Sequence, residues 1–294
     1  MVTLRAPSSA RGFTLIEAIM VITITGIIAS IVAVFIKTSV DSYLSTSRRA
    51  ELTEAADVAL RKLAREVRLA VPNSLRLPPP AACPAPNAAN TCNYLEFVPT
   101  KDGGRYRNEG DGSSGPGIKF LCTGGSTNAT FDVLGVMPSI VTGDFIVVYN
   151  DASLGSLGSP SNVYGGGSRA ATTNNVSPLS IGALTNNTLI CSYANNRFQV
   201  VDKNIRAVTY ACPTAVAGTM TRYWNYGFNA VQATPPGGSF ASAQVVQNAT
   251  CAMNYTPNVL QRNGLLSITL TVTDGTPSGE RIVAFREIHV DNAP

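Results

Sequence analysis

The stretch FTLIEAIMVITITGIIASIVAVFI, Phe13 to Ile36, decides how this chain is organised. Its 24 residues carry a single charge, that of Glu17. A helix of this length is about 36 Å long, which is enough to cross the hydrocarbon core of a bilayer. Arg5 and Arg11 precede it, and basic residues mark the end of a membrane span that stays in the cytoplasm. We therefore expect a single transmembrane helix over residues 13–36, with the rest of the chain exported.

Other kinds of amino-terminal segment fit this stretch less well. A secretory signal has a shorter apolar core and a small-residue cleavage site after it, whereas this run ends in Ile36-Lys37-Thr38-Ser39. A lipoprotein signal needs a cysteine just after the apolar run, and the first cysteine is Cys83. A plain signal anchor gives no reason for Glu17, because an acid inside a membrane costs several kcal/mol unless it is paired. Glu17 is therefore a candidate functional residue, and the alternative is that it lies near the lipid headgroups.

The helix is predicted to continue well beyond the membrane. After Val40 the apolar residues follow a three-four spacing, which is typical of one buried helix face: Leu52, Ala56, Leu60, Leu63, Val67 and Ala70. Charged residues occupy the opposite face, and Pro72-Asn73 ends the pattern. The sequence thus predicts one helix from Phe13 to Val71, roughly 90 Å long, whose second half packs against another part of the chain.

Composition bounds the remaining possibilities. The chain has 294 residues, of which 45% are apolar and only 14% charged. The apolar share allows a sizeable core, and the low charge suits a secreted or cell-surface protein. The net charge of +4 is spread along the sequence without a basic cluster. This distribution argues against nucleic acid as a partner.

The cysteines point to disulfides rather than to a metal site. The six are Cys83, Cys92, Cys122, Cys191, Cys212 and Cys251. None forms a C-x-x-C pair and His289 is the only histidine, so the clustered ligands of a zinc site are missing. An even number of cysteines in a loop-rich exported chain favours disulfides, and buried free thiols are the alternative.

No residue pattern predicts catalysis or a cofactor. His289 has no serine or cysteine nucleophile near it in the sequence. Asp102, Glu109 and Asp111 could bind calcium but lack the spacing of an EF-hand, which leaves this question open. We therefore predict no catalytic residue, no metal ligand and no cofactor, and hence a protein that is not an enzyme.

The rest of the chain, residues 72–294, reads as short strands separated by long loops. The clearest strands are 265–273, which alternates apolar and polar residues, and 281–290, which follows it after a turn. They predict an antiparallel hairpin. Loops are expected at about 76–93, 101–116 and 151–186, where Pro, Gly, Ser and Asn dominate. Long loops often bind ligands, but 151–186 could equally be surface padding.

The string Arg11-Gly12-Phe13-Thr14-Leu15-Ile16-Glu17 resembles the prepilin peptidase site of type IV pilins and type II secretion pseudopilins. The resemblance implies cleavage between Gly12 and Phe13 and N-methylation of Phe13. It also makes Glu17 the acid at the fifth mature position, which we expect to pair with the Phe13 amine of a neighbouring subunit. The implied partners are a prepilin peptidase, other major and minor pilins through the helix, an inner-membrane assembly platform, and the lipid bilayer before assembly.

This family resemblance also implies an α+β fold shaped like a lollipop, with the long helix packed on an antiparallel β-rich head. The parts would be a cleaved leader at 1–12, a helix at 13–71 with its transmembrane segment at 13–36, and a β-rich globular head at 72–294. Major pilins commonly have a proline at the twenty-second mature position, where this chain has Val34. Its absence and the large head fit a minor pilin better than a major one.

Segments near the carboxyl end resemble MshO-type minor pilins of the PilW and J-type pseudopilin group, among them Val208–Cys212 and Val246–Cys251. In that setting Cys212 and Cys251 flank a pair of strands and are the first candidate disulfide. Cys83 with Cys92, and Cys122 with Cys191, are the remaining candidate pairs among fifteen possible pairings.

The resemblance predicts a minor subunit of an MSHA-type type IV pilus, which initiates or caps the filament and promotes its assembly. The protein would lie in the inner membrane as a single-pass protein with a periplasmic head, and later in the pilus at the cell surface. Two alternatives are a J-type pseudopilin of a type II secretion system and a tip adhesin or DNA-binding minor pilin.

Overall fold

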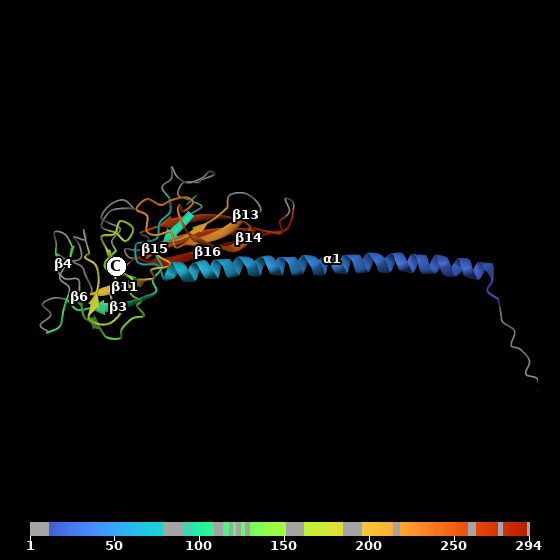
Figure 1. The fold of residues 1–294 in the computed structure, drawn as a ribbon. Helices are drawn as coiled ribbons and strands as arrows, with labels where there is room; N and C mark the ends of the chain where they lie inside the picture. Colours follow the sequence, from blue (N-terminus) through green and yellow to red (C-terminus); the bar gives the residue numbers. More distant parts are fainter. Residues whose placement is uncertain are drawn as a thin grey trace, which may run out of the picture. The chain divides into compact units, whose positions relative to one another are not determined.

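A computed structural model describes residues 12–78, 91–92, 94–108, 114–117, 120–121, 125–126, 130–150, 162–184, 196–213, 218–257, 263–275 and 279–292. The fold is α+β, as predicted, because one long helix is followed by an antiparallel, β-rich head (Figure 1). The chain divides into two compact units, Met1–Glu51 and Leu52–Pro294. The helix contributes to both units, and all the described strands belong to the second.

The helix α1 runs from Leu15 to Arg68, two residues later and three residues earlier than the predicted ends. Within the second unit its buried side chains form one stripe: Ala56, Ala59, Leu60, Leu63, Ala64 and Val67. Leu63 and Val67 are completely inaccessible to solvent. The predicted apolar stripe is therefore confirmed within the second unit, where this part of α1 packs on the main sheet of the head.

The main sheet has seven antiparallel strands. Its order is β16 (Arg281–Asp291), β15 (Asn263–Thr273), β14 (Ala241–Thr256), β13 (Gly218–Trp224), β12 (Val208–Ala211) and β2 (Tyr94–Phe97), and β1 (Thr91–Cys92) also pairs with β14. Buried residues of these strands meet the apolar stripe of α1 and form the largest core of the head. Figure 1 shows β13 to β16 lying along the carboxyl-terminal part of α1.

The predicted hairpin is confirmed as β15 and β16, which pair without interruption from Asn263 with Asp291 to Thr273 with Arg281. Alternate residues of β15 are buried, because every second side chain of a strand points to the same face. The neighbouring strand β14 is the longest of the main sheet and runs without a break from Ala241 to Thr256. Within β14, Asn248 has a left-handed φ of 51°, a conformation that asparagine tolerates, and pairing with β15 begins at the next residue, Ala249.

A second antiparallel sheet lies between β2 and β12 in the sequence. Its order is β7 (Val133–Leu134), β3 (Asp102–Tyr106), β11 (Arg197–Val201), β8 (Phe145–Val147) and β9 (Arg169–Ala171). Two smaller pairs accompany it: β6 (Thr130–Phe131) with β10 (Leu179–Ser180), and β4 (Phe120–Leu121) with β5 (Gly125–Ser126). Figure 1 shows β3, β6 and β11 grouped together, apart from β13 to β16.

Two of the predicted loops, 101–116 and 151–186, contain strands, so these predictions were wrong in part. Strand β3 lies in the expected loop 101–116, and β9 and β10 lie in the expected loop 151–186. The glycines of β3 suggested a turn, but Gly104 instead makes room for a neighbouring ring. A Cβ at Gly104 would come within 2.6 Å of the ring of Phe198, which is buried in β11. The glycine thus allows an aromatic side chain to pack against the backbone of a strand.

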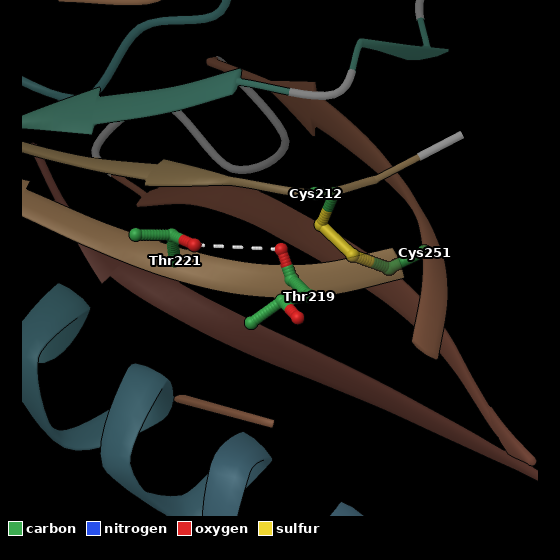
Figure 2. Close-up of a disulfide and its surroundings, with 4 residues drawn as sticks. All are labelled: Cys212, Thr219, Thr221 and Cys251. Carbon is green, nitrogen blue, oxygen red and sulfur yellow. Dashed lines mark hydrogen bonds between the residues drawn. A yellow bond between two sulfur atoms is a disulfide. The ribbon is translucent and has the colours of Figure 1, made fainter. Parts of the chain in front are cut away.

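A disulfide joins Cys212, which follows β12, to Cys251 in β14 (Figure 2). Strand β13 lies between these two strands in the sheet, and Figure 2 draws two of its residues, Thr219 and Thr221, in the surroundings of the disulfide. The Cα atoms of the two cysteines are 5.5 Å apart, and Cys212 is buried in the main core. The disulfide therefore connects two strands that share no backbone ladder.

Replacing both cysteines by serine is expected to lower the free energy of unfolding by about 4 kcal/mol. The bond closes a loop with a sequence separation of 39, and chain entropy gives roughly this value for such a loop. Urea unfolding followed by the fluorescence of Trp224, the only tryptophan, measures the change. A double variant as stable as the wild type would contradict a stabilising role.

Candidate functional site

The described chain begins just before the predicted peptidase site. Gly12 and Phe13 are exposed and precede the first helical residue, Leu15. An added Cβ at Gly12 would meet nothing within 4 Å. The Gly12–Phe13 peptide bond therefore lies outside the helix, in a form that a peptidase can reach.

Thr14 is the amino-terminal cap of α1. Its side-chain oxygen Oγ1 accepts a hydrogen bond from the backbone N–H of Glu17 at 3.3 Å, and its carbonyl accepts the bond from Ala18 at 3.1 Å. Threonine followed by glutamate three residues later is the sequence signature of a capping box. The string Thr14-Leu15-Ile16-Glu17 contains this signal, so the cap at Thr14 could have been predicted from the sequence as well as the charge of Glu17.

Glu17 thus lies in the first turn of the helix and is exposed. Backbone N–H groups at a helix start have no partner within the helix and carry partial positive charge. A carboxylate is favourable there, and the cap fixes where the helix begins relative to Phe13. The arrangement holds an anion four residues from the predicted new amino terminus.

The apolar side chains that follow are uncovered within their unit. Phe13 is 72% exposed, Ile22 70% and Phe35 71%. Among the described residues, α1 is the one helix long and apolar enough to span a membrane, and none of its most apolar window is buried. Soluble domains do not leave such a surface in water, so it requires lipid or other apolar helices as its surroundings.

The polar side chains inside this span are compensated by the helix itself. Thr23 donates to the carbonyls of Ile19 and Met20, and Thr25 donates to that of Val21 at 2.6 Å. Ser30 donates to the carbonyl of Ile27 at 2.7 Å. Hydroxyls bonded in this way do not need water, which suits a bilayer. Glu17 therefore remains the single charged group between Phe13 and Ile36.

Two ion pairs connect the second half of α1 to the main sheet. Glu66 Oε2 accepts a hydrogen bond from Arg222 Nε in β13 at 2.8 Å, and the Arg222 guanidinium lies 4.8 Å from the ring centre of Trp224. In the second pair, Asp57 Oδ1 lies 3.9 Å from Nη1 of Arg286 in β16. These contacts supplement the apolar stripe in fixing the helix on the sheet.

The other predicted site residues are placed only in part. Five of them lie outside the described residues: Cys83, Cys122, Cys191, Glu109 and Asp111. The side chain of Cys92 is not described either.

The two remaining predicted residues, Asp102 and His289, are described. Asp102 accepts hydrogen bonds from the backbone N–H groups of Ser139 and Gly103, and these bonds lower the pKa of its carboxyl. His289 is exposed on β16. Within the described part of the chain no three His, Cys, Asp or Glu residues gather as metal ligands.

Comparison with known proteins agrees with this geometry. Residues 7–33 match the family model described as the prokaryotic N-terminal methylation motif. No curated protein and no solved structure matches the chain significantly. The match covers the predicted cleavage site, the Thr14 cap, Glu17 and most of the apolar span. The chain therefore carries the prepilin-type amino-terminal signal of type IV pilin-like proteins, which points to a structural subunit rather than an enzyme.

Proposed function

We propose that this protein is a minor pilin of an MSHA-type type IV pilus, which initiates or caps the filament and promotes its assembly. The observation that carries the proposal is the methylation motif at residues 7–33, followed directly by an uncovered apolar helix. A subunit with such a helix can reside in the inner membrane and then pass into a filament whose interior is built from similar helices.

The proposed processing begins with removal of residues 1–12 by a prepilin peptidase. Cleavage after Gly12 exposes the amine of Phe13, and N-methylation keeps its positive charge. In a filament interior an unpaired amine or carboxylate costs several kcal/mol. Pairing Glu17 with the Phe13 amine of a neighbouring subunit relieves both costs, and it sets the axial register of the incoming helix.

The proposed membrane orientation rests on the basic residues that precede the span. Arg5 and Arg11 precede it, which favours a cytoplasmic amino terminus and a periplasmic head. The proposed partners are the other major and minor pilins, which contact α1, and the inner-membrane assembly platform. The Cys212–Cys251 disulfide agrees with an oxidising compartment for the head.

Two features favour a minor subunit over a shaft subunit. Val34 stands where major pilins commonly have a proline, so α1 continues as a helix through this position. The head also contains a second sheet in addition to the one that packs on α1. A regularly packed shaft leaves little room for a head of this size, whereas a tip position does not crowd it.

The mature protein is expected to begin at an N-methylated Phe13. Mass spectrometry of the amino-terminal peptide measures this directly, and an intact Met1 would contradict the proposal. Gly12→Val is a suitable comparison, because a side chain at Gly12 would meet no other part of the described chain. Accumulation of its uncleaved precursor would then reflect failed processing and not misfolding.

The same signal occurs in pseudopilins, so a second experiment separates a pilus from a secretion system. Deletion of the gene is expected to reduce surface pili and to leave the export of secreted enzymes unchanged. The opposite result would favour a J-type pseudopilin. If the deletion leaves pilus number normal but lowers adhesion or DNA uptake, the tip adhesin or DNA-binding alternative is favoured instead.

A further inference from the structure

The second sheet is an insertion within the main sheet. Strands β2 and β12 are antiparallel neighbours, with Phe97 directly opposite Val208, although 110 residues separate them in the sequence. All nine described strands between them, β3 to β11, pair only with one another. The chain therefore leaves the main sheet after β2, builds a separate set of strands, and returns to the adjacent position in the main sheet.

The apolar cores follow the same division. Among the described residues, the buried members of the main core come only from positions 56–97 and 208–290. The core of the second sheet draws only on positions 106–200, and its largest members include Tyr106, Phe131 and Phe198. Each set of strands therefore buries its own apolar side chains, which is the mark of a domain with its own core.

The contact between the main part and the insertion is smaller than either core, and it combines apolar and polar side chains. A third cluster brings Val71, Val98 and Ala207 of the main part against residues of the insertion: Val147, Val163, Tyr164 and Val201. Polar contacts surround it, because Tyr164 Oη donates to the Ser74 carbonyl at 2.7 Å and Asn150 Nδ2 donates to the Pro72 carbonyl at 2.8 Å. Interfaces between domains of one chain have this mixed apolar and polar character.

We propose that residues 99–206 form an inserted module that is separable from the unit of α1 and main sheet. The main unit contains the helix stripe, the Cys212–Cys251 disulfide and the ion pairs that hold α1 on the sheet. It therefore holds what folding and helix-mediated assembly require. The module is an additional part of the head, available for a contact outside the filament. Its role in the filament rests on the proposed function, but its separability does not.

The test replaces residues 99–206 by Asn-Gly in the otherwise complete chain. This two-residue turn suits antiparallel neighbours, because Val98 and Ala207 extend the strands in which Phe97 opposes Val208. A second version also carries Val71→Thr and Val98→Thr, since both side chains are fully buried at the contact and the deletion would expose them. Each protein is purified from membranes in detergent and compared with the wild type.

Both shortened proteins are expected to form the Cys212–Cys251 disulfide and to unfold cooperatively, with Trp224 fluorescence as the readout. Backbone amides of β13 to β16 should retain slow hydrogen exchange. If the version with threonines lacks the disulfide and protected amides, the module is required for folding and the proposal is wrong. A shortened protein that folds but stays out of filaments, while the full-length chain enters them, would also overturn the proposed division of labour. If even the full-length chain never enters filaments, the proposed function fails, whereas the folding measurements still decide separability.

Discussion

Glu17→Gln is expected to leave leader cleavage intact and to prevent entry of the protein into filaments. Glutamine can still act at the third helical position of a capping box, so the start of α1 should not move. Only the negative charge is lost, and with it the proposed partner of the Phe13 amine. Breaking a pair away from water costs roughly 3–5 kcal/mol, which corresponds to about a hundredfold or more in subunit affinity.

The measurement compares the amount of processed protein in membranes with the amount in sheared filaments. Glu17→Ala removes both the charge and the side chain that a capping box uses at this position, so a difference between the two variants isolates the contribution of capping. Glu51→Gln is the matched control, because Glu51 is an exposed glutamate of the same helix that lies outside the apolar span. Incorporation of Glu17→Gln at the wild-type level would rule out charge pairing as the assembly mechanism.

Features that depend on a repeating local pattern could be predicted from the sequence. The apolar run from Phe13 to Ile36 and the three-four spacing after it predicted α1 and its buried stripe. Such a prediction is possible because residues three or four apart lie on the same face of a helix. Alternation in residues 265–273 predicted β15 and its hairpin for the same reason. The motif at Gly12 to Glu17 is equally local, since its residues adjoin one another.

Features that depend on distant partners could not be predicted in this way. Nothing adjacent to Gly104 indicates that the ring of Phe198 will cover it, so β3 looked like a loop. The pairing of Phe97 with Val208 is set by the main sheet as a whole, and no local signal marks the residues between them as an insertion. Thr14 differs from these residues, because its capping partner Glu17 lies three residues away and the signal is therefore local.

The clearest example of a contact between distant residues is the buried ion pair of Arg76 and Glu96. Arg76 follows the turn after α1, and Glu96 lies in β2. Both side chains are only 1% exposed, and Arg76 Nε donates to Glu96 Oε2 at 2.7 Å. The remaining guanidinium nitrogens donate to the carbonyls of Asn229 and Ala230, and the group lies 3.5 Å above the ring of Tyr164. The buried guanidinium and the buried carboxylate are thus both compensated. An unpaired charge at such a buried place would be costly.

Arg76→Met is therefore expected to lower the free energy of unfolding by roughly 3–5 kcal/mol, because Glu96 is left buried without its cation. Burial already raises the pKa of Glu96, although Arg76 and the hydroxyl of Tyr226 oppose this effect. Removing Arg76 raises this pKa further. A carboxyl whose pKa is higher in the folded state loses stability as the pH rises, so the deficit of the variant should be small below about pH 4.5 and grow toward neutral pH.

Urea unfolding at pH 4 and pH 7, followed by Trp224 fluorescence, separates the loss of charge compensation from the loss of packing. A deficit equal at both pH values would mean that the contact with Tyr164, and not the charge of Glu96, accounts for the effect. Arg76→Met combined with Glu96→Leu should recover much of the stability, because no uncompensated charge remains. Arg61→Met is the matched control: its pair with Asp57 is 71% and 44% exposed, so its loss should cost no more than about 0.5 kcal/mol.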